Sequence, residues 1–163
     1  PGSPELPRGR EQWLRLMSLL AVVTLRSYGG VIMSFPWRAG AWAWIAALCV
    51  VGGKCIGGFA SDRFGEVRSA TVTLSAAAAA LIFSAFPLPG ALGLLLFNMS
   101  MPVTLYAARD ILREGRATAF GLLTLGLFLG MLPAFSGASG SGQDYAMICL
   151  ISIMLIRVGV GKR

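Results

Sequence analysis

The sequence predicts an all-α membrane protein with six transmembrane helices and both termini in the cytoplasm. Three observations predict this fold class. Hydrophobic residues make up 56% of the 163 residues and charged residues only 13%, with a mean hydropathy of +0.73, whereas a soluble chain needs more charge to cover its surface. The apolar residues form six runs long enough for a bilayer. The basic residues gather between these runs, as membrane topology requires.

The first twelve residues, PGSPELPRGREQ, are polar and rich in proline. They lack the apolar core of a signal peptide. We therefore expect residues 1–12 to be a polar tail, either native or the remnant of a tag or linker. The transmembrane domain is expected to span residues 13–163.

Each of the six apolar runs has about 16–23 residues, which is sufficient to cross a hydrocarbon core of roughly 30 Å. Five intervals with turn chemistry separate them: FPWRAG, SDRFGEVRS, FPLPG, RDILREGR and SGASGSGQD. The predicted helices lie near residues 13–35, 41–60, 69–87, 90–108, 117–135 and 145–160.

The orientation of the helices follows from the cations. Eleven of the 14 basic residues form four clusters that fall on one side of the membrane if six helices alternate. The three intervals on the other side hold only Arg38, so the positive-inside rule places both termini in the cytoplasm. This pattern explains the net charge of +7 without a nucleic-acid partner. The clusters are Arg8, Arg10 and Arg15; Arg63 and Arg68; Arg109, Arg113 and Arg116; and Arg157, Lys162 and Arg163.

The segment GGFASDRFGEVRS joins the second and third predicted helices. It resembles the signature cytoplasmic loop of the major facilitator superfamily, which has glycine, three residues, aspartate, a basic residue, one residue, glycine and then basic residues. Because the segment also lies at the position where that family has this loop, the resemblance extends beyond a short match. The matching positions are Gly58, Asp62, Arg63, Gly65 and Arg68.

The match departs from the family pattern at Glu66 and Val67, where the family usually has basic residues. In the family this loop is a latch on the cytoplasmic side that holds one end of the alternating-access cycle. The resemblance implies that Asp62 lies at a helix end and pairs with cations and a neighbouring helix N-terminus.

Two further segments resemble the same family. The run ARDILREGRATAFGLLTLGLFLG is similar to the connection into its fifth or eleventh helix, including the small residues Gly121, Gly126 and Gly130. The run LRSYGGVIMSFPW resembles the seventh helix of fosmidomycin-resistance-type exporters, which indicates a C-terminal half. Members of the family have twelve helices in two six-helix halves, with the substrate path between them. The resemblance therefore implies a partner: a second copy of this chain or a separate N-terminal-half chain.

Two cations, Arg26 and Lys54, lie inside apolar runs. A cation within a membrane costs at least about 2.5–3.5 kcal/mol on insertion scales, so such residues usually face a cavity and bind something. The guanidinium of Arg26 suits carboxylate or phosphonate oxygens. Its alternative role is pairing with backbone carbonyls or with an acid of the partner. Lys54 either lines the same cavity or extends its long stem to the cytoplasmic surface.

The fourth predicted helix contains Asn98 and Pro102. Pro102 is expected to kink this helix and free a backbone carbonyl. Asn98 is a candidate for substrate binding, and the alternative is an inter-helix hydrogen bond. Tyr28 and Tyr106 are further candidates for the same site.

All seven acidic residues lie in predicted loops or helix flanks, and the chain has no histidine. Helix-embedded proton relays usually use Asp, Glu or His, so uniport or exchange is expected rather than proton symport. We expect no enzymatic activity, cofactor or metal, because no nucleophile has a base nearby and no metal-binding spacing occurs. The acids are Glu5, Glu11, Asp62, Glu66, Asp110, Glu114 and Asp144.

The expected function is therefore that of a half-transporter in the cell membrane. Two halves would together form an alternating-access path for a small organic anion. Two alternatives remain open: a non-transporting accessory subunit or isolated half, and a homodimeric anion channel.

Overall fold

The computed structural model describes residues 9–112, 116–137 and 139–160. Within these residues the chain forms seven α-helices, a short 3₁₀ helix η1 and no β-strand. The helices are α1 (Arg10–Ile32), α2 (Ala41–Phe64), α3 (Glu66–Ile82), α4 (Pro87–Met99), α5 (Met101–Ile111), α6 (Arg116–Met131), η1 (Leu132–Ser136) and α7 (Gly142–Val160).

Four helical segments are long and apolar enough to cross a membrane. They are α1, α2, the 25-residue segment Pro87–Ile111 formed by α4 and α5 together, and α7. The other two predicted spans correspond to α3, with 17 residues, and α6, with 16. The all-helical, membrane-compatible fold class is thus confirmed, and length identifies four of the six predicted spans.

Several helix boundaries differ from the prediction. Helix α1 begins at Arg10, so the last three residues of the expected polar tail are helical. Helix α2 continues four residues beyond its predicted end at residue 60, to Phe64, and α3 begins directly after Gly65. Gly65 has a φ of +84°, a conformation that L-residues with side chains rarely adopt. The chain therefore reverses at this single glycine, and the predicted loop is a tight corner between two helices.

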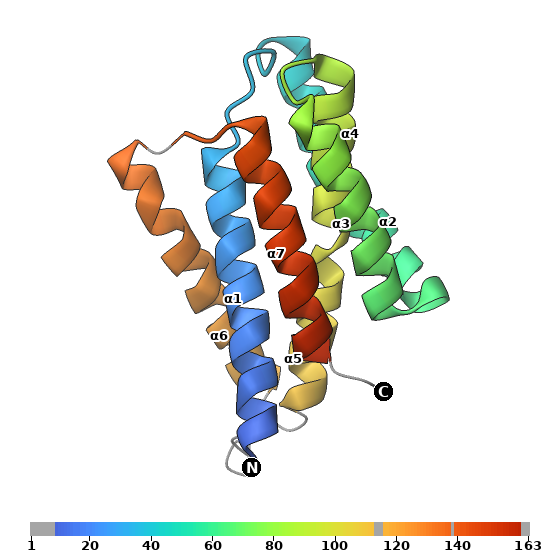
Figure 1. Cartoon of the computed structure of the whole chain (residues 1–163), viewed down its shortest axis with the longest axis vertical. Helices are drawn as coiled ribbons and strands as arrows, with labels where there is room; N and C mark the ends of the chain where they lie inside the picture. The colour runs from blue at the N-terminus through green and yellow to red at the C-terminus, as the bar shows by residue number, and fades with distance from the viewer. Residues whose placement is uncertain (1–8, 113–115, 138, 161–163) are drawn as a thin grey trace.

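The helices alternate in direction along the bundle (Figure 1). The start of α1, the α2–α3 corner, the end of α5 and the end of α7 lie toward the lower end in this view. The basic residues Arg10, Arg63, Arg109 and Arg157 belong to these helix ends, whereas Arg38 follows α1 at the other end. The basic residues that the sequence predicts on one side of the membrane therefore lie toward the same end of the bundle.

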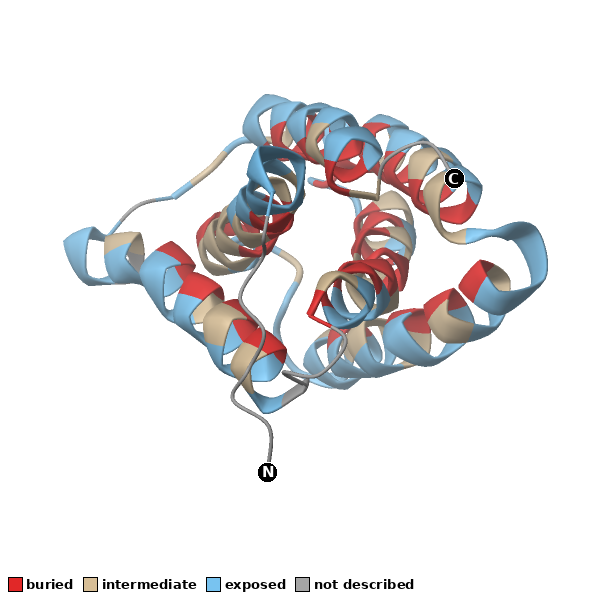
Figure 2. Ribbon diagram, turned by 90° about the horizontal axis from the view of Figure 1, so that it is seen from below, coloured by how far each residue is buried: buried red, intermediate tan, exposed pale blue. Residues whose placement is uncertain are grey.

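The sides of the helices that face one another are buried, and the outward sides are exposed (Figure 2). Many outward side chains are large and apolar, which is the reverse of a soluble surface and fits a lipid environment. Examples with more than half of their surface exposed are Leu48, Phe59, Val72, Leu88, Phe128 and Met154.

Glycines allow two pairs of helices to approach closely. A Cβ atom at Gly53 or Gly57 of α2 would collide with the backbone of α4. A Cβ atom at Gly126 or Gly130 of α6 would collide with atoms of α1. Of the predicted small-residue seam, Gly121 has nothing within contact distance, so only its last two members pack against α1.

The helical segment is interrupted between α4 and α5, where Ser100 separates the two helices. Pro102 has no amide hydrogen to donate to the carbonyl of Asn98, one turn earlier. At the same place the Ser100 hydroxyl donates a hydrogen bond to the carbonyl of Phe97, at 3.0 Å. The predicted interruption by Pro102 thus occurs, two residues before the proline.

Candidate functional site

A cavity of about 560 Å³ lies between α1, α2, α4, α5 and α6. Helices α3 and α7 pack behind it, against each other and against α4 and α1 respectively. Its walls combine a few polar side chains with many apolar ones. The lining residues are Val23, Arg26, Ser27, Gly30, Met33, Arg38, Val50, Lys54, Leu94, Phe97, Asn98, Met101, Pro102, Thr104, Leu105, Phe120, Leu123, Thr124 and Leu127.

Arg26 lies in the middle of α1 and is only 8% exposed. Its guanidinium carbon lies 5.1 Å from the centroid of the Phe97 ring, within the range of a cation–π interaction. Its Nη1 atom is buried and has no hydrogen-bond partner. An unpartnered cationic donor in an apolar interior is costly, so an acceptor that reached this nitrogen would stabilise it.

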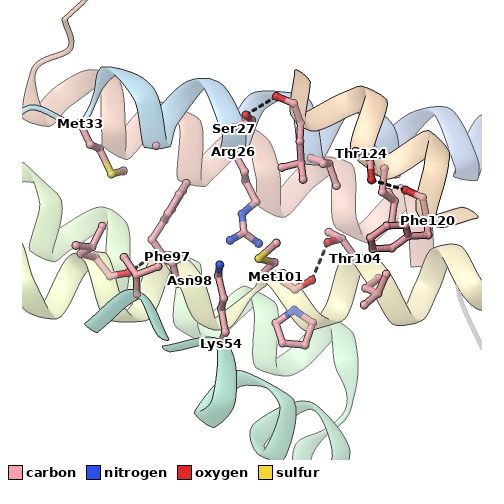
Figure 3. Close-up of a pocket in the computed structure, with 18 of the residues that line it drawn as sticks. Arg26, Ser27, Met33, Lys54, Phe97, Asn98, Met101, Thr104, Phe120 and Thr124 are labelled. Carbon is pink, nitrogen blue, oxygen red and sulfur yellow. Dashed lines mark hydrogen bonds between the residues drawn. The ribbon is translucent and has the colours of Figure 1, made fainter. Parts of the chain in front are cut away.

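Lys54 and Asn98 approach the same point from other helices. Figure 3 shows the Lys54 side chain extending from α2 toward the guanidinium of Arg26, with Asn98 beside them. One N–H of the Asn98 amide donates to the carbonyl of Leu94, at 2.8 Å, which fixes the orientation of this side chain. The arrangement brings two cations and an amide from three helices to one part of the cavity, and each of these groups can donate hydrogen bonds to an oxyanion.

The cavity is lined by cations without acids. Arg38 adds a third positive charge to those of Arg26 and Lys54, and no Asp or Glu of the described chain lines the cavity. The described acids instead lie in the first or last turns of helices, such as Asp62 in α2 and Asp144 in α7. Positive charge in a low-dielectric cavity concentrates the field and favours an anion.

The hydroxyl groups in the walls donate to backbone carbonyls. Ser27 donates to Leu127 at 2.6 Å, Thr104 to Met101 at 2.8 Å and Thr124 to Phe120 at 2.8 Å. Their protons are therefore already used. The free donors of the site are concentrated on the three cations and Asn98.

Three of the five candidate substrate-binding residues, Arg26, Lys54 and Asn98, thus line one cavity, and two do not. Tyr28 follows Arg26 by two positions, which turns it to another side of α1. Tyr106 lies on the exposed side of α5.

The motif residues lie away from the cavity. Asp62 and Arg63 occupy the last turn of α2, and Arg68 the first turn of α3, all three exposed. Among the described residues no ion pair of Asp62 is present, and the pairing that the resemblance implies stays a prediction. Gly58, one turn earlier in α2, has open space around it.

Three further residues line the cavity and were not among the predicted site residues: Phe97, Phe120 and Arg38. Helical spacing predicts other lining residues, because Gly30, Leu94 and Pro102 lie four positions from Arg26 or Asn98 and share their helix faces. Phe97 lies only one position from Asn98, a spacing that does not predict a shared face. Phe120 carried no such signal, because only tertiary packing brings α6 opposite α2 and α5.

Among the described residues no group of His, Cys, Asp and Glu side chains could hold a metal ion, and Cys49, Cys55 and Cys149 are free thiols.

Comparison of the chain with protein-family models, curated proteins and solved structures finds no match.

Proposed function

We propose that this chain is one half of a major-facilitator-type secondary transporter, which binds a small organic anion between Arg26 and Lys54. The observation that carries the proposal is the convergence of these two cations in a cavity without described acids (Figure 3). An anion with two or more oxygens would satisfy the unpartnered Nη1 of Arg26 and offset the repulsion between the cations.

The exposure of Lys54 supports the need for a second half. This residue lies in the centre of α2 and is exposed, although it lines the cavity. A cation at this depth is costly against lipid. A partner with a matching six-helix unit, either a second copy or a separate N-terminal-half chain, would cover it and close the path.

The topology in this proposal has six spans, with α3 and the α6–η1 segment crossing beside the four longer ones. The 17 residues of α3 are at the lower end of the length that crosses a bilayer. Both termini would be cytoplasmic, because the basic helix ends lie together. The corner of Gly58, Asp62, Arg63, Gly65 and Arg68 would then be the cytoplasmic latch of the cycle.

Ligand-dependent thermal unfolding of the purified chain in detergent tests the proposal. Small carboxylates and phosphonates should raise the midpoint of wild type, and Arg26→Ala should abolish the rise. Arg10→Ala, at the exposed start of α1, is the control and should respond as wild type does. An equal response of wild type and Arg26→Ala would contradict the assigned role.

Flux through proteoliposomes then identifies the kind of pathway. A transporter gives saturable flux that a counter-anion on the other side accelerates, whereas a channel gives flux that rises in proportion to the driving force. Because the acids lie outside the helix centres, exchange without a proton current is expected. A proton-dependent current in a purified homodimer would contradict this part.

A further inference from the structure

We infer that the ligand is an amphiphilic anion, whose apolar body lies beside the charged group in the cavity section formed by α5 and α6. This inference rests on the proposed anion site and specifies the class of its ligand. It is carried by the size of the cavity, by the apolar wall of Leu105, Phe120 and Leu123, and by the displacement of Phe120 from Arg26 and Lys54 along the bundle.

The size of the cavity exceeds what a bare anion requires. Cavities of roughly 300–1,000 Å³ hold ligands of drug size, and this one has about 560 Å³. A single carboxylate or phosphonate between Arg26 and Lys54 would leave most of that volume without ligand atoms. An apolar cavity filled only by water is unfavourable, because its walls offer water few partners.

The cavity has distinct polar and apolar parts. Figure 3 shows Arg26, Lys54 and Asn98 together at one level, with Phe120 and Thr124 displaced from them along the bundle. Because α6 begins at the basic end and Phe120 lies in its second turn, this part of the cavity extends toward the basic end. A ligand that fits both parts of the cavity has its charged group at one end and its apolar body at the other.

The hydroxyls near the apolar wall do not make it a polar site. Thr104 and Thr124 donate their protons to backbone carbonyls of their own helices. Leu105 and Phe120 both line the cavity, and their exposed fractions are 48% and 65%. Much of their apolar surface therefore touches no protein atom, and the part that faces the cavity can contact the hydrocarbon of a ligand.

Binding of alkylphosphonates of increasing length tests the inference. Methyl-, butyl- and hexylphosphonate share one headgroup, and calorimetric titration of the detergent-solubilised chain gives their affinities. The expected result is a gain of roughly two- to fourfold per methylene, as transfer of CH₂ groups out of water predicts. Butanol and hexanol, which lack the anionic group, should bind much more weakly.

A matched pair of variants locates the apolar body. Phe120 and Phe128 both lie on α6 with exposed fractions of 65% and 58%, but only Phe120 lines the cavity. Phe120→Ala should remove most of the dependence on chain length, and Phe128→Ala should retain it. Since both side chains are largely exposed, neither change is expected to unfold the bundle, and equal melting midpoints would verify this.

The contrary outcomes are distinguishable. Equal affinity for all three phosphonates would overturn the amphiphilic ligand and leave the anion site intact. A full chain-length dependence in Phe120→Ala would overturn the placement of the apolar body. Absence of phosphonate binding to wild type would overturn both this inference and the proposed function.

The same chemistry is offered by a soluble amphiphilic anion and by an anionic lipid. Nanodiscs distinguish the two sources. Hexylphosphonate affinity that falls when phosphatidylglycerol is added to phosphatidylcholine nanodiscs identifies lipid as a competing ligand. Unchanged affinity identifies the site as selective for the soluble anion.

Discussion

The guanidinium of Arg26 lies over the ring of Phe97, with 5.1 Å between the guanidinium carbon and the ring centroid. The ring face stabilises the cation in part, by roughly 0.5–2 kcal/mol, while Nη1 stays without a hydrogen bond. The guanidinium is thus only partly stabilised by its surroundings, which is what the proposed anion site requires of it. Replacing Arg26 by an apolar residue should therefore abolish anion binding without lowering the free energy of unfolding.

Replacing Arg26 by methionine, an apolar side chain of similar length, tests this expectation. Arg26→Met should leave the free energy of unfolding unchanged or raise it by about 1 kcal/mol, because a buried, partly satisfied charge is removed. Stabilisation by anions should be lost. Chemical unfolding with and without butylphosphonate measures both effects. A destabilisation of several kcal/mol without ligand would show that Arg26 is needed for folding instead.

The close packing of α2 on α4 predicts a sharp difference between adjacent glycines. A Cβ atom at Gly57 would collide with the backbone of Met99, whereas Gly58 has open space. Gly57→Ala should lower the free energy of unfolding by about 1–3 kcal/mol. Gly58→Ala should leave it unchanged or raise it by up to about 1 kcal/mol, since alanine favours helix. Equal effects at the two positions would contradict this packing.

Tyr145 links the end of α1 to the segment before α7, at the end of the bundle opposite the basic helix ends. Its hydroxyl lies 3.0 Å from the carbonyl oxygen of Ile32 and 2.7 Å from that of Gly140, and it accepts from the amide of Ser34 at 3.2 Å. Tyr145→Phe should lower the free energy of unfolding by about 1–3 kcal/mol, because buried polar groups lose their partner. The exposed Tyr106→Phe is the control, and its melting midpoint should match wild type.

Because water reaches the cavity, a thiol placed in its wall at position 124 should be reactive. In a background with the three native cysteines replaced by alanine, Thr124→Cys, at an exposed position that lines the cavity beside the proposed anion site, should react with a negatively charged methanethiosulfonate. Butylphosphonate should slow the reaction at least about fivefold by occupying the site. Phe59→Cys, which is 80% exposed on α2 but outside the cavity, should show no such protection.

The outcome that would contradict a ligand in the cavity is equal labelling of Thr124→Cys with and without phosphonate. Mass spectrometry of the intact protein over a time course distinguishes slowed labelling from partial unfolding, because unfolding would increase labelling at both positions.

Much of the fold could be predicted because hydrophobic patterning acts locally. Apolar runs specify helices wherever backbone groups have no water to bind, so the positions of α1, α2 and α7 followed from composition. The residues at which these helices begin and end could not be predicted from composition. Gly65 makes a one-residue corner where a loop was expected, and α1 begins at Arg10, because cap geometry depends on single backbone conformations.

The candidate site was predictable only in its charged part. Arg26 and Lys54 are conspicuous because cations are rare inside apolar helices. Phe97 and Phe120 are ordinary residues in an apolar sequence, and helix packing alone distinguishes them from Phe128 or Phe59. Tyr28 and Tyr106 were chosen for their chemistry, but their helix faces turn them away from the cavity.

Composition and the order of residues along each helix are sufficient to make this chain helical, apolar on its outside and asymmetric in charge. Helix packing is needed to bring Arg26, Lys54 and Asn98 to one cavity and to place an apolar wall beside them. Those relationships depend on how far glycines let α2 approach α4 and α6 approach α1, and such distances are fixed by contacts between segments far apart in the chain.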